Sequence, residues 1–60
     1  MRIAIVSEAM VPAEAMRRVV TSGGEHSVAW VAHDGLTAVN LCAQDKPDLI
    51  LMDLSLPLLD

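Results

Sequence analysis

Short apolar runs alternate along the chain with stretches in which apolar residues recur every three or four positions. Three runs, at residues 2–6, 27–32 and 49–52, have the length and the aliphatic content of β-strands. Between them, residues 10–22 and 35–44 carry apolar side chains at helical spacing. The pattern therefore predicts five elements in the order β-α-β-α-β.

The ends of both predicted helices carry recognisable signals. Pro12 suits a first helical turn, where its missing N–H has no partner, and Gly23-Gly24 suits a helix end. Asp34 has the position of an N-cap for the second helix, and Pro47 disfavours helix in the residue before it.

The predicted core follows from the same periodicities. Alternation in the second strand puts Val28, Trp30 and Ala32 on one face. The buried helical positions are expected to be Met10, Ala13, Met16 and Val20 in the first helix, and Ala38, Leu41 and Cys42 in the second, with Val39 as a further candidate.

Short connections between alternating strands and helices indicate a parallel sheet with right-handed crossovers. In a doubly wound sheet the first strand is central, the strand order is 2-1-3, and sites form at the carboxyl ends of the strands. Glu8 and Asp53 both follow strands at that edge. Two carboxylates there suit Mg²⁺, and one of them can accept a phosphoryl group as a nucleophile. The alternative is that both acids only cap strand or helix ends.

Composition and charge exclude several classes of function. The chain has 60 residues, one cysteine and two histidines, so neither a disulfide framework nor a zinc cluster is expected. Four basic residues and a net charge of −4 argue against nucleic-acid binding. No apolar run is long enough to span a membrane, and no signal peptide is evident, so a cytoplasmic domain is expected.

Other candidate groups have structural interpretations. The turn at residues 7–12 lacks the glycines of dinucleotide-binding and P-loop turns, which excludes both kinds of nucleotide site. His26 and His33 are expected to be solvated loop residues.

Residues 47–60 resemble the phosphoacceptor segment of two-component response-regulator receiver domains: an apolar strand, Asp53, a short spacer, and Leu56-Pro57 before a final aspartate. Residues 31–39 resemble the second strand and the following helix start of the same family. Within that family, residues 1–6 and 30–32 look most like CheB-type chemotaxis methylesterases, including WspF-like members.

The resemblance implies a flavodoxin-like (CheY-like) fold and a phosphorelay function. Asp53 is then the residue phosphorylated by a CheA-like histidine kinase, and Mg²⁺ is the cofactor, held by Glu8, Asp53 and the backbone carbonyl of Ser55. The chain departs from the family pattern at Ser7, where receivers usually carry a first acid. A phosphorylation-incompetent docking module is the alternative function.

The resemblance also implies that residues 1–60 form the N-terminal part of one receiver domain. The remaining strands, the switch residues and an esterase or other output domain would lie further on, so the chain itself is not expected to be an enzyme, whereas its parent would be a protein-glutamate methylesterase. The third strand would then have an unpaired apolar edge, and two copies are expected to pair through residues 49–52.

Overall fold

The computed structural model describes residues 1–52, and all five predicted elements are present in that part of the chain. They are β1 (Arg2–Val6), α1 (Met10–Ser22), β2 (Ser27–Ala32), α2 (Gly35–Gln44) and β3 (Leu49–Met52).

The three strands form a parallel sheet in the order β2-β1-β3. The last residue of β1, Val6, pairs with Ala32 at the end of β2 and with Met52 at the end of β3. All three strands therefore end at the same edge. The predicted α/β class, parallel sheet and strand order 2-1-3 are confirmed, consistent with a partial flavodoxin-like fold.

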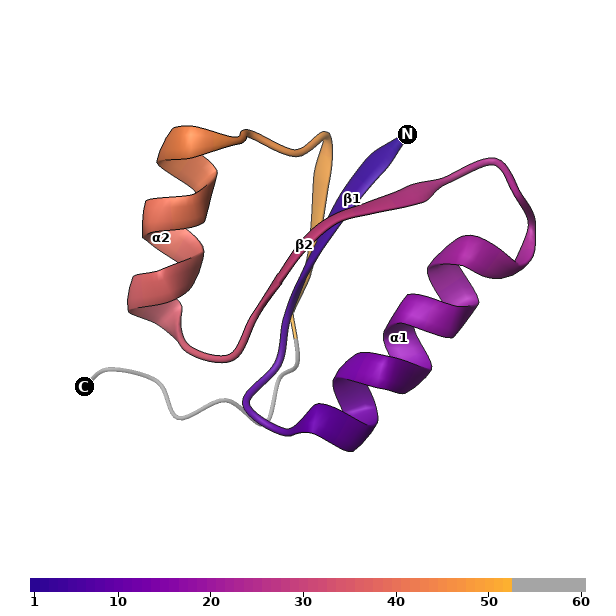
Figure 1. Cartoon of the computed structure of the whole chain (residues 1–60), viewed down its shortest axis with the longest axis horizontal. Coiled ribbons are helices and arrows are strands. Elements are labelled where there is room, and N and C mark those ends of the chain that lie inside the picture. Colours follow the sequence, from indigo (N-terminus) through magenta and orange to yellow (C-terminus); the bar gives the residue numbers. More distant parts are fainter. Residues whose placement is uncertain (53–60) are drawn as a thin grey trace.

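The two helices cover opposite faces of this sheet (Figure 1). On one face, Ile3 and Ile5 of β1 pack with Ala13 and Val20 of α1. The other face has a second cluster, made of Val6, Ala32 and Ala38. Because successive strand residues point to opposite faces, the central strand β1 contributes to both clusters, and its residues 3–6 are buried.

The face predicted for β2 is correct for Trp30 and Ala32, which share the second cluster, but wrong for Val28, because the strand contains an irregularity. Ile3 pairs with Val28 but Ile5 pairs with Val31, so β2 uses one more residue than β1 over the same length. An extra residue in a strand shifts the alternation of its side chains. Val28 and Val31 consequently pack on the α1 side, whereas Trp30 packs on the α2 side.

Helix α1 follows the predicted stripe except at its first residue. Ala13 and Val20 are buried and Met16 packs against their cluster, but Met10 is 75% exposed. Val39 of α2, the additional candidate for the core, is likewise exposed. Helix α1 ends at Ser22, and Gly24 then adopts a φ of +73°, a conformation that residues with a Cβ rarely take.

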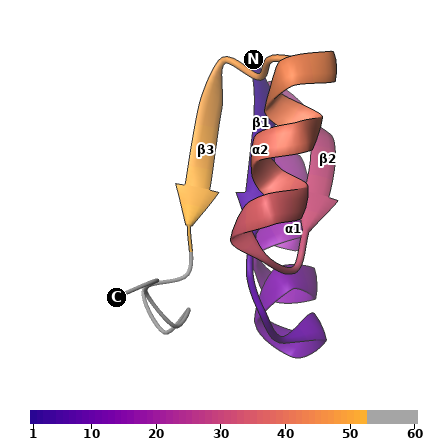
Figure 2. The ribbon, with the colours of Figure 1, turned by 90° about the vertical axis from the view of Figure 1, so that its left-hand side faces the viewer.

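Strand β3 lies at one side of the sheet, where neither helix overlaps it in Figure 2, and of its side chains Leu51 packs against the cluster shared by β1 and α1. Its apolar side chains at positions 49, 50 and 52 are exposed, although residues of this type are usually buried. The predicted exposed apolar third strand is thus present in the described part of the chain. Pairing of two copies through it stays a prediction.

The start of β1 is tied to the loop between α2 and β3. The Arg2 guanidinium donates two hydrogen bonds to the Asp45 carboxylate, at 2.7 and 2.6 Å. Its backbone N–H donates to Asp48 Oδ2 at 2.8 Å, and the Asp48 N–H donates back to the Arg2 carbonyl at 2.9 Å. These contacts help to hold β3 in register with β1, and register decides which face each side chain occupies.

The predicted N-cap of α2 is confirmed. Asp34 Oδ1 accepts a hydrogen bond from the Thr37 N–H at 2.7 Å, and Oδ2 accepts one from the Thr37 hydroxyl at 3.0 Å. These bonds, the backbone one first, lower the pKa of the Asp34 carboxyl below its usual value, because they favour its charged form.

Asp34→Ala is expected to lower the thermal midpoint, because the cap is lost. The lowered pKa means that the charged cap stabilises the fold above the ordinary pKa of 3.8, and that this contribution is lost as the pH falls through the folded-state value. Thermal melts of the two proteins should therefore differ most above about pH 4 and converge in acid. Asp34→Asn is the control, since asparagine caps equally well without titrating. A constant difference at every pH would contradict this prediction.

Candidate functional site

The candidate site is the edge of the sheet at which all three strands end. Because Val6 is paired on both sides, the residue after it leaves the sheet between the ends of β2 and β3. This is the place where open parallel α/β sheets form their ligand sites.

Ser7, the residue at which the chain departs from the family pattern, is fully buried at this edge. Its backbone N–H donates to the Ala32 carbonyl at 2.9 Å, which continues the β1–β2 ladder one residue beyond the strand. Its hydroxyl donates to the Ala9 carbonyl at 3.1 Å and so stabilises the turn that leads into α1. Ser7 thus has a structural role within residues 1–52.

Glu8 follows Ser7 and is exposed at the same edge. Within residues 1–52, both ion pairs use other acids: Arg2 pairs with Asp45 and Arg17 pairs with Glu14. The Glu8 carboxylate is therefore accessible to a ligand from solvent.

His33 is the residue whose place in the site the sequence did not indicate. It follows β2 and is exposed as expected, but its ring Nδ1 lies 2.9 Å from the Ser7 carbonyl oxygen. The contact links the ends of β1 and β2, which are far apart in sequence. The available signal was weak: His33 directly follows a strand that the predicted sheet places beside β1.

The two remaining predicted site residues, Asp53 and Ser55, lie outside the described residues. Their proposed parts in phosphorylation and metal binding therefore stay predictions. In the part of the chain that the structure covers, no three His, Cys, Asp or Glu side chains come together in a group that could hold a metal ion. No helix there is long and apolar enough to cross a membrane.

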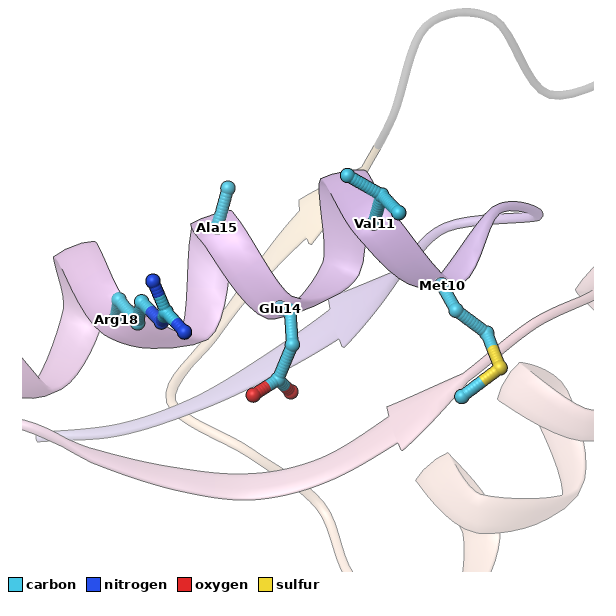
Figure 3. A pocket seen from close by; sticks show the side chains of 5 residues that line it. All are labelled: Met10, Val11, Glu14, Ala15 and Arg18. Atoms are coloured by element: carbon cyan, nitrogen blue, oxygen red, sulfur yellow. The ribbon is translucent and has the colours of Figure 1, made fainter.

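A shallow hollow runs along α1, starting near the same edge (Figure 3). It is lined by Met10, Val11, Glu14, Ala15 and Arg18. The two apolar side chains at its start, Met10 and Val11, are 75% and 81% exposed. Because the two exposed apolar side chains are adjacent, they form a candidate contact surface beside the site.

Comparisons with known proteins identify longer proteins that contain a segment similar to this chain. No protein-family model matches the chain. All 60 residues align with proteins named protein-glutamate methylesterase/protein-glutamine glutaminase, with 52% identity to one from Mesorhizobium japonicum and 50% to one from Pseudomonas fluorescens. A protein of the same name from Pseudomonas aeruginosa is 45% identical over the same length.

The chain spans 18% of the length of each of these relatives. The match therefore concerns one segment of much longer proteins, and it includes the strand ends and the turn described above. Over its whole length, the chain is therefore similar to one segment of proteins named protein-glutamate methylesterase/protein-glutamine glutaminase.

Proposed function

We propose that this receiver-type segment accepts a phosphoryl group from a histidine kinase on Asp53, with Mg²⁺ as cofactor. The observation that carries the proposal is the pairing of Val6 with Met52. Asp53 is joined directly to Met52, and Glu8 follows Val6 by two residues. In the sequence, each acid thus follows a strand whose last residue is described at this edge of the sheet.

The donor groups suit a hard divalent cation. Mg²⁺ prefers oxygen ligands, takes few of them from the protein and keeps several waters. Glu8 supplies an exposed carboxylate, and the proposal adds the Asp53 carboxylate and the Ser55 carbonyl. Ser7 has no carboxylate, and its buried hydroxyl donates to a backbone carbonyl. Glu8 is therefore the acid of this turn. When bound, Mg²⁺ would neutralise negative charge on the transferring phosphoryl group.

The residues of the chain then have distinct parts in the transfer. An Asp53 carboxylate oxygen forms the new bond to phosphorus while the phosphorus–nitrogen bond of phosphohistidine breaks, and the imidazole leaves with the electron pair. Such a transfer depends mainly on positioning and on charge stabilisation. The ladder of β1 and β3 supplies the positioning, and Glu8 helps to hold the cation.

An intact-mass spectrum of the protein, recorded with a small phosphodonor in the presence and absence of Mg²⁺, tests this proposal. One phosphoryl adduct that requires Mg²⁺ is the expected result. Absence of any adduct under both conditions would contradict it and favour the alternative, a receiver-like docking module.

We further propose that the hollow along α1 contacts the kinase partner. Its start, at Met10 and Val11, lies beside the proposed acceptor edge, so a partner seated there could present a phosphohistidine to Asp53. Arg18 lines the hollow, whereas Arg17 pairs with Glu14 at 2.6 Å.

The names of the relatives support an esterase or glutaminase domain as the output controlled by this segment.

Val11→Glu is expected to slow phosphoryl transfer from the cognate kinase by about tenfold, since a buried charge in an interface costs at least 1.4 kcal/mol, roughly one decade. Phosphorylation by the small donor should keep its wild-type rate. Val39→Glu is the matched control, because Val39 is similarly exposed but belongs to α2. Equal slowing by both variants, or equal slowing with both donors, would refute a kinase contact at this hollow.

A further inference from the structure

We propose that His33 is a positioning residue for the Glu8 carboxylate. Its ring holds the Ser7 carbonyl and thereby fixes the orientation of the peptide unit that joins Ser7 to Glu8. The inference rests on the proposed function, because it concerns the binding of Mg²⁺ at Glu8. It starts from the 2.9 Å contact between His33 Nδ1 and the Ser7 carbonyl oxygen.

The partner of this contact determines which ring nitrogen of His33 carries a proton. A carbonyl oxygen can only accept a hydrogen bond, so Nδ1 must carry the proton. Neutral His33 is then the Nδ1–H tautomer, with an unprotonated Nε2. The hydrogen bond formed by one ring nitrogen sets the state of the other, as it does in histidines at metal sites.

Planarity of the peptide bond transmits this contact to Glu8. The Ser7 carbonyl and the Glu8 N–H belong to one rigid peptide unit. The ring of His33 holds that unit, while the Ser7 N–H is bound to the Ala32 carbonyl and the Ser7 hydroxyl to the Ala9 carbonyl. The backbone on both sides of Glu8 is therefore fixed by contacts from β2 and from the start of α1.

Fixing the backbone is important here because the acid is a glutamate. Glutamate has one more rotatable bond than aspartate, so holding its carboxylate in one place costs more conformational entropy. A rigid backbone removes part of that cost before the cation arrives. Groups that orient a metal ligand in this way commonly affect metal affinity although they never touch the metal.

The test compares four proteins: wild type, His33→Ala, His33→Asn and the control His26→Ala. His26 lies at the opposite end of β2, where its Nδ1 is 3.3 Å from the N-terminal nitrogen of Met1. The first readout is the ¹⁵N chemical shifts of the His33 ring in the metal-free wild type, which identify the tautomer. The second is the Mg²⁺ dissociation constant of each protein, measured by titration calorimetry without phosphodonor.

The expected ¹⁵N spectrum shows the Nδ1–H tautomer. His33→Ala should bind Mg²⁺ about three- to tenfold more weakly, the range for one lost hydrogen bond. His33→Asn should recover most of the affinity, because an amide N–H can replace Nδ1–H, and His26→Ala should match the wild type.

Each contrary outcome identifies what has failed. A proton on Nε2 of neutral His33 overturns the inference whatever the affinities are. Equal dissociation constants for wild type and His33→Ala, or equal weakening in the Ala and Asn variants, also overturn it while leaving the proposed function intact. A wild type that binds no Mg²⁺ overturns the proposed function and the inference together.

Discussion

Asp53→Ala is expected to abolish the Mg²⁺-dependent phosphoryl adduct completely. Alanine has no oxygen with which to attack phosphorus, so the variant loses the nucleophile and one proposed metal ligand at once. Loss of a nucleophile eliminates the covalent product, whereas loss of a neighbouring group only slows its formation. The measurement is the intact-mass spectrum of the variant after incubation with a small phosphodonor and Mg²⁺.

Glu25→Ala serves as the control, because it also removes one acid but lies just before β2, at the opposite edge of the sheet. The Glu25→Ala variant should acquire the adduct as the wild type does.

An adduct that persists in Asp53→Ala would place the acceptor at another residue, and fragment masses would then identify that residue. A Glu8→Gln variant should retain a residual adduct at higher Mg²⁺ concentration, since glutamine keeps one oxygen ligand but loses the charge.

Ile5→Ala is expected to reduce the free energy of unfolding by about 2–5 kcal/mol, the range observed when a buried isoleucine or leucine is truncated. Ile5 is fully buried in the central strand, where it packs in the cluster formed with α1. A chain of this size has only about 3–9 kcal/mol of stability in total, so the change can unfold much of the population.

Urea titration followed by the fluorescence of half-buried Trp30 measures this change. Leu36→Ala is the matched control, because Leu36 is 73% exposed on α2 and its truncation should alter stability by less than about 0.5 kcal/mol. Similar losses in both variants would show that the face covered by α1 is not the main core.

The fold of residues 1–52 was largely predictable from local patterns. Buried parallel strands and amphipathic helices have different periods, and the signals at Asp34 and Gly24 mark helix ends through local hydrogen bonding and backbone freedom. The prediction failed where one residue broke the alternation. Because of the extra residue of β2, Val28 lies on the α1 side while Trp30 and Ala32 lie on the α2 side, and no local signal in an otherwise regular apolar run shows such an irregularity.

The candidate site was predictable in outline. The chain order and the rules for parallel sheets were sufficient to bring the ends of β1 and β3 together, and thus to nominate Glu8 and Asp53. The roles of Glu8 and Asp53 in a site stay predictions. The contact of His33 with Ser7 was not predictable, because it joins residues 26 positions apart and depends on the direction of one side chain.

By itself, the sequence determined the elements, their order and the edge at which the strands end, because periodicity, capping and chain direction are properties of neighbouring residues. Only the tertiary structure decided the register of β2, the exposure of Met10 and the link from His33 to the Glu8 turn. Each of these depends on which surfaces meet across the sheet, and packing between distant segments selects among arrangements that the local sequence leaves equally favourable.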